Sequence, residues 1–104
     1  MKTLKYIITP LVMLLTSTVS FAQKDSIALQ REARKLVREG NKLYGQNNFI
    51  DASVAYKKAL QKNSAYIKAT YNLGNSLYQE KNFKEAIPQY SVAVESEKDS
   101  FKKA

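Results

Sequence analysis

Basic side chains recur along residues 31–42 at the spacing that places them on one side of a helix. The five are Arg31, Arg34, Lys35, Arg38 and Lys42. Such a stripe can dock on an anionic lipid surface or on an acidic partner. Glu32 and Glu39 are interleaved with it, however, and long basic side chains favour solvated helix faces, so the plainer interpretation is a solvated face.

Catalytic chemistry has few candidates in this chain of 104 residues. It contains no His and no Cys, and so lacks the commonest general base, the commonest zinc ligand and any thiolate nucleophile. Glu95, Glu97 and Asp99 form an acidic cluster that could touch a calcium ion, but the glycine and oxygen spacing of a calcium loop are missing. No phosphate-binding loop or nucleophile elbow occurs either. We therefore expect no enzymatic activity, no cofactor and no metal.

Two similar segments of the sequence, 34 residues apart, would form the secondary structure that positions these side chains. The stretch GNKLYGQNNFIDASVAYKKAL at residues 40–60 aligns without a gap with GNSLYQEKNFKEAIPQYSVAV at residues 74–94. Nine identities result, one of them a leucine and the others small, amide or aromatic residues, and a repeat would use such positions for packing. The chain is therefore predicted to be a repeat protein.

Each unit is predicted to be a pair of helices. Apolar residues of the first unit follow the three-and-four spacing of one helical face: Leu29, Ala33, Leu36, Val37, Gly40, Leu43 and Tyr44. Asp25 or Ser26 can cap this helix at its start. Asn47 and Asn48 favour a turn, and a side-chain oxygen there can cap the second helix. That helix carries Phe49, Ala52, Val54, Ala55, Tyr56, Ala59 and Leu60.

The second unit follows the same plan. We expect a helix over about 65–80, a turn at Lys81 and Asn82, and a helix from Phe83 to about Glu97. Pro88 lies inside the last of these helices and predicts a local bend. No segment alternates with a period of two residues, so the fold class is predicted to be all-α.

The 34-residue period and the paired helices resemble the tetratricopeptide repeat family. The residues that carry the resemblance are Gly40, Gly74, Ala52, Ala86, Ala59, Ala93, Tyr56 and Tyr90. The resemblance implies a helix-turn-helix solenoid with a lead-in at 23–32, repeats at 33–66 and 67–100, and the start of a truncated third repeat at 101–104. Glu39, Ser64, Thr70 and Lys98 depart from the family pattern, and Lys35 or Lys42 lies within helical reach of Glu39.

The family's geometry also implies a concave groove lined by the first helix of each repeat. In repeat one the groove positions are Arg34, Val37, Arg38, Asn41, Tyr44 and Gly45. In repeat two they are Lys68, Tyr71, Asn72, Asn75, Tyr78 and Gln79. Such a groove would hydrogen-bond an extended peptide and attract carboxylates. The chain's tyrosines are expected to serve core and groove packing rather than the stacking of bases or sugars.

Some members of the family clamp a C-terminal carboxylate. Asn41, Asn72 and Lys102 match three of the clamp positions, whereas Val37 stands where a clamp lysine belongs. The alternative is that both asparagines are ordinary groove residues.

The N-terminal segment is typical of a secretory signal peptide. Lys2 and Lys5 precede an apolar run, and small residues precede a cleavage site between Ala22 and Gln23. We expect residues 1–22 to be removed and the product to be periplasmic or otherwise exported. The alternative is an uncleaved anchor, but Pro10 and several threonines interrupt the run.

The segments REGNKLY and ATYNLGNSLY after such a signal are similar to the exported repeat proteins of the Bacteroides aerotolerance group. That resemblance implies a scaffold in an oxidative-stress complex. We therefore predict an exported module that binds a protein or peptide through its groove, with no nucleic-acid partner. The alternative is a structural subunit that docks on a membrane or an anionic envelope surface through the basic first helix.

Overall fold

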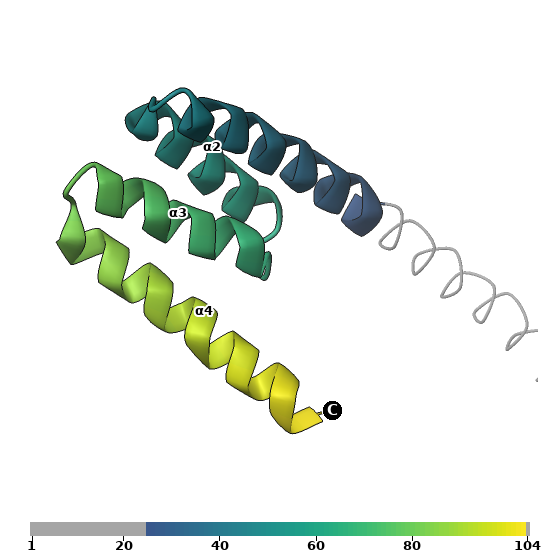
Figure 1. Ribbon diagram of the computed structural model, residues 1–104. Helices are drawn as coiled ribbons and strands as arrows, with labels where there is room; N and C mark the ends of the chain where they lie inside the picture. The colour runs from purple at the N-terminus through teal and green to yellow at the C-terminus, as the bar shows by residue number, and fades with distance from the viewer. Residues whose placement is uncertain (1–24, 104) are drawn as a thin grey trace, which may run out of the picture.

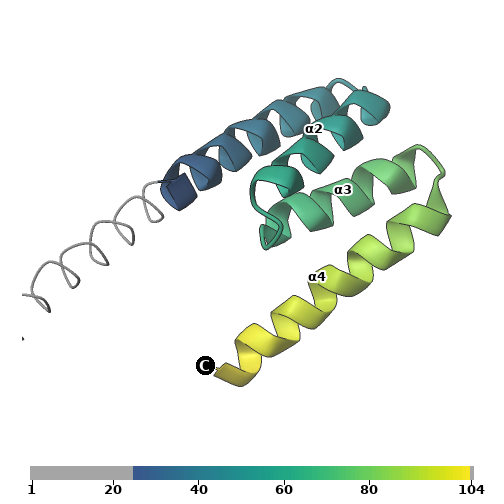
Figure 2. The same ribbon diagram turned by 180° about the vertical axis from the view of Figure 1, so that it is seen from behind.

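Four consecutive helices make up the part of the chain that the structure describes, residues 25–103 of a computed structural model. Residues 25–45 are helical and are called the first helix below. They are followed by α2 (Phe49–Lys62), α3 (Ile67–Gln79) and α4 (Phe83–Lys103). Figures 1 and 2 show these helices side by side in chain order, with direction alternating from one to the next. Over this range no strand occurs, and the all-α helical repeat prediction is confirmed.

The two helix pairs are joined internally by the same turn. Asn47 and Lys81, 34 residues apart, both adopt positive φ, at 60° and 63°. The next residue donates its backbone N–H back to the last turn of the helix, Asn48 to Leu43 O at 2.9 Å and Asn82 to Leu77 O at 2.8 Å. This left-handed closure satisfies carbonyls that a helix end leaves without partners. The predicted turns are therefore confirmed.

Two predicted helix caps are wrong. Asn48 lies at the start of α2 but makes no side-chain cap; its amide instead donates to the Asp51 carboxylate at 2.8 Å. That charged acceptor lies one helical turn further on and binds the amide more strongly than a neutral group would. Residues 25 and 26 are already helical, so neither Asp25 nor Ser26 caps the start of the first helix. The predicted cleavage site between Ala22 and Gln23 lies outside the described residues.

Small side chains let the helices approach closely. Ala33, Ala52, Ala59, Ala69 and Ala86 are almost fully buried and form one cluster with larger residues. The larger members of the cluster are Val37, Tyr56, Leu73 and Leu77. Methyl-sized residues at helix crossings bring the two axes together, and this spacing builds the wall of the site described below.

The last helix is longer than predicted. α4 continues through Pro88 and on to Lys103, whereas a helix end near Glu97 was expected. In the first repeat the turn is made by Asn63, whose backbone is extended and whose side chain accepts the N–H of Ala65 at 3.2 Å. Glu97 occupies the equivalent position in α4, and glutamate is a good helix former that offers no such local bond. Residues 101–103 therefore extend α4 and do not open a separate helix.

Candidate peptide-binding hollow between the repeats

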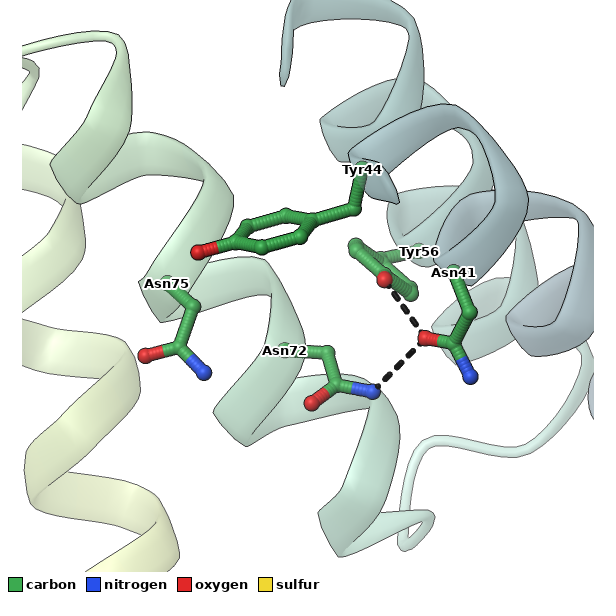
Figure 3. Close-up of a pocket in the computed structure, with 5 residues that line it drawn as sticks. All are labelled: Asn41, Tyr44, Tyr56, Asn72 and Asn75. Carbon is green, nitrogen blue, oxygen red and sulfur yellow. Dashed lines mark hydrogen bonds between the residues drawn. The ribbon is translucent and has the colours of Figure 1, made fainter. Parts of the chain in front are cut away.

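A hollow of about 200 Å³ lies where the two repeats meet. The first helix contributes Asn41 and Tyr44, α2 contributes Tyr56, and α3 contributes Asn72 and Asn75. Figure 3 shows these five side chains directed toward a common space. The lining therefore consists of amides and phenols and carries no formal charge at neutral pH.

Each repeat holds one asparagine in place with a tyrosine from its second helix. The Tyr56 hydroxyl donates to Asn41 Oδ1 at 2.6 Å, and the Tyr90 hydroxyl donates to Asn75 Oδ1 at 2.6 Å. The tyrosine ring lies against the glycine that precedes the asparagine. A Cβ on Gly40 would come within 2.5 Å of the Tyr56 ring, so only glycine leaves room for this contact. The glycine, asparagine and tyrosine that repeat in the sequence thus form one structural unit.

A third hydrogen bond joins the repeats across the hollow. Asn72 Nδ2 donates to Asn41 Oδ1 at 3.1 Å, as the dashed lines of Figure 3 show. Asn41 Oδ1 then accepts two hydrogen bonds, the number for which an amide oxygen has lone pairs. What Asn41 can offer a ligand is its NH₂ group, while Asn72 can offer its carbonyl oxygen. The pair presents a donor and an acceptor together, as a peptide bond requires.

The phenols of the units remain neutral well above physiological pH. Burial, together with a smaller contribution from the neighbouring Tyr44, raises the pKa of Tyr56 from 10.0 to about 12. Burial also raises the pKa of Tyr90, with smaller contributions from Tyr71, Tyr44 and Tyr78. Both hydroxyls therefore keep the proton that they donate to asparagine.

Edge-to-face aromatic pairs brace the tyrosines of the first helix and α3. Tyr44 and Phe49 have ring centroids 5.1 Å apart, and the equivalent pair Tyr78 and Phe83 lies at 5.2 Å. Tyr71 packs in the same manner on Tyr90 at 5.8 Å. Such pairs restrict the ring that borders the groove without burying it.

The structure brings together four of the predicted groove residues, namely Asn41, Tyr44, Asn72 and Asn75. Other predicted positions are exposed but do not line the hollow: Arg34, Arg38, Gly45, Lys68, Tyr71, Tyr78, Gln79 and Lys102. Arg38 precedes Asn41 by three residues and Lys68 precedes Asn72 by four, so the surface one helical turn away is basic.

One groove residue was predicted wrongly and one was missed. Val37 is 4% exposed and belongs to the hydrophobic core, because its side of the first helix faces α2 and α3. Tyr56 lines the hollow although the sequence suggested packing alone. Its repetition at Tyr90, always sixteen residues after the glycine, was the signal that could have linked it to Asn41.

The fold and the site define an all-α helical repeat protein with two equivalent helix pairs and a polar hollow between them. Comparisons with protein-family models, curated proteins and solved structures give no match to the chain. The resemblance to tetratricopeptide repeats therefore stays a prediction. Within residues 25–103, no helix is long and apolar enough to cross a bilayer. The same range holds no cluster of three or more acidic, His or Cys side chains suited to a metal ion.

Proposed function

We propose that this chain is a protein-interaction module that binds an extended segment of a partner in the hollow between its repeats. The observation that carries the proposal is the set of three asparagine amides around a space of about 200 Å³. Amides that offer both a donor and an acceptor match the main chain of an extended peptide, whatever its side chains. The predicted signal peptide would place this module outside the cytoplasm.

Main-chain recognition fits the hollow better than a carboxylate clamp. No lysine or arginine lines it, Val37 is buried where a clamp lysine would be needed, and Lys102 is exposed near the end of α4. An isolated carboxylate in the hollow would lack a cation to pair with, which is costly. The basic side chains Arg38 and Lys68 lie one turn away and favour acidic residues that flank the bound segment.

Peptide display against the chain, followed by titration of a selected peptide, tests the proposal. Asn72→Ala should weaken binding by about three- to tenfold, the effect of losing one hydrogen bond. Gln61→Ala is the matched control, because it removes an exposed amide of α2 outside the hollow. Side-chain NH₂ resonances of the hollow's asparagines should shift during the titration. Equal affinity of the Asn72→Ala variant, with unshifted amide resonances, would refute the proposal.

A second candidate function is docking on an anionic surface through the basic stripe. All five basic residues of the stripe are exposed, and none is within 4.0 Å of a carboxylate among the described residues, whose ion pairs involve other lysines. Co-sedimentation with vesicles containing phosphatidylserine should then be strong at low salt and collapse at high salt. Replacement of Arg34 and Arg38 by Gln should abolish it, while Lys57→Gln on α2 should not. Retention of binding at high salt would exclude this function.

A further inference from the structure

The outer face of α4 is apolar and uncovered. Ile87, Val94 and Phe101 follow one another at seven-residue spacing and are 64%, 49% and 88% exposed. Tyr90, Ser91 and Glu95 join Ile87 and Val94 in lining a shallow depression on this face, and Glu95 is the charged residue among them. Figure 2 shows α4 at the edge of the layer, with a neighbouring helix on one side only. The surface formed by Ile87, Tyr90, Ser91, Val94 and Phe101 is called the α4 face below.

The same chain shows what covers such a face. The residues of α2 equivalent to Ile87, Tyr90 and Val94 are Ser53, Tyr56 and Leu60. Ser53 and Tyr56 are 3% and 1% exposed and Leu60 is partly buried, because α3 packs beside α2. The buried residues of α3 include Ala69, Thr70 and Leu73, which are small or of leucine size. The packing between α2 and α3 is therefore a template for a helix that packs on α4.

The contact between the two repeats also includes a hydrogen bond that, within residues 25–103, the second repeat lacks on its α4 side. Asn72 of α3 donates to Asn41, whereas the equivalent oxygen on Asn75 receives only the Tyr90 hydroxyl among the described residues. A donor at the position of Asn72 would complete the second unit as it completes the first.

A second copy of the chain does not fit this face head to tail. The positions of the first helix equivalent to Ala69, Leu73 and Ser76 are Lys35, Glu39 and Lys42, all exposed. Glu39 lies within ion-pair distance of neither lysine, contrary to what the sequence suggested. Pressing these charges against Ile87 and Val94 would bury Glu39 and at least one of the lysines without a partner, since Glu95 is the single charged residue among the described residues that line the depression.

We propose that the α4 face binds an amphipathic helix of a partner protein that carries the α3 pattern: two adjacent small residues, then an amide donor and a leucine-sized residue. The amide donor of that helix would meet Asn75, which also lines the hollow, but this inference does not rest on the proposed function.

A peptide of residues 65–81, stapled between the exposed positions 71 and 78 so that it is helical in isolation, is the direct probe. The control peptide is residues 31–47, stapled at the equivalent positions 37 and 44, which places Lys35, Glu39 and Lys42 on the contact face. Binding to the chain of 104 residues is followed by fluorescence anisotropy. The first peptide should bind saturably and the second should not.

Two variants separate this face from the rest of α4. Val94→Lys should weaken the first peptide by more than about tenfold, because a lysine would be buried against it. Val92→Lys should have no effect; Val92 is 52% exposed, and the equivalent residue of repeat one is already Lys58. Circular dichroism of both variants checks that the fold is kept. Absence of binding, equal binding of the two peptides, or an unaffected Val94→Lys variant would overturn the proposal. So would sedimentation showing a dimer of the chain that Val94→Lys dissociates, since the occupant would then be a second copy.

Discussion

Replacing the two repeat glycines by alanine should have opposite effects on stability. Gly40→Ala would place a methyl group 2.5 Å from Cε1 and 2.8 Å from Cδ1 of Tyr56, which is 1% exposed and held by Asn41. Gly74→Ala would place it 3.0 Å and 3.1 Å from the same atoms of Tyr90, a ring that is only partly buried and can move aside. The two substitutions are chemically identical, so a difference between their effects on stability reports the difference in packing around the two sites.

The magnitudes follow from opposing contributions. Alanine in place of glycine inside a helix gains about 1 kcal/mol of helix propensity at either site. Overpacking a buried site costs about 1–3 kcal/mol, and displacing the Tyr56 hydroxyl from Asn41 costs about 1 kcal/mol more. Gly40→Ala should therefore destabilise the fold by about 1–3 kcal/mol, while Gly74→Ala should be neutral or stabilise it by up to about 1 kcal/mol.

Urea and thermal unfolding followed by circular dichroism measure both values. In a domain of this size each kcal/mol moves the Tm by about 4–8 °C, so Gly40→Ala should melt well below Gly74→Ala. The matched control repeats Gly40→Ala in a Tyr56→Leu background, where no ring opposes the methyl group and the substitution should become stabilising. A Gly40→Ala variant as stable as Gly74→Ala, or an unchanged cost in the Tyr56→Leu background, would refute the reasoning.

Three further predictions concern single side chains, each measured as a free energy of unfolding in urea. Lys81→Asn should stabilise the fold by about 0.5–1 kcal/mol, because Lys81 has positive φ and asparagine, which repeat one uses at Asn47, tolerates that conformation; a loss of stability would contradict it. Ser76→Ala should stabilise the fold by about 1 kcal/mol, because this hydroxyl is buried with no hydrogen-bond partner among the described residues; Ser96→Ala in α4, where the side chain is only partly buried, tests the propensity part. The folded-state pKa of Tyr56 is raised to about 12, so the stability that the neutral phenol contributes is fully present below pH 10 and is lost as the pH rises toward 12. The free energy of unfolding should fall by about 2–3 kcal/mol over this range. Tyr56→Phe should accordingly lose less stability over that range than the wild type, and equal slopes would argue against burial as the cause.

The 34-residue repeat period was enough to predict most of the fold from the sequence. Nine identities at a fixed distance predicted two helix pairs, because the same residues must meet the same neighbours in each unit. Asn47 and Lys81 show why the sequence predicts the position of each turn but not the positive φ of its residues. Asparagine suggests a left-handed residue, whereas lysine adopts one only because the backbone hydrogen bonds around it require it.

The errors concern the ends of helices and the contacts between elements. Whether Val37 faces the groove or the core depends on the rotation of the first helix against α2, which the apolar spacing leaves open by about one residue in a turn. The length of α4 depended on a single polar residue, since Asn63 ends one helix and Glu97 continues the other. Tyr56 was assigned to packing because a ring that fills the core gives no sign, in sequence, of where its hydroxyl emerges.

The unit formed by Tyr56 and Asn41 gives the chain a built-in optical reporter. The sequence contains seven tyrosines and no tryptophan, so phenols dominate its intrinsic ultraviolet emission. Two of them, Tyr44 and Tyr56, line the hollow, and the hydroxyl of one is hydrogen-bonded to an amide that a ligand would touch. Occupation of that space can thus be followed as a change in emission from the unlabelled protein.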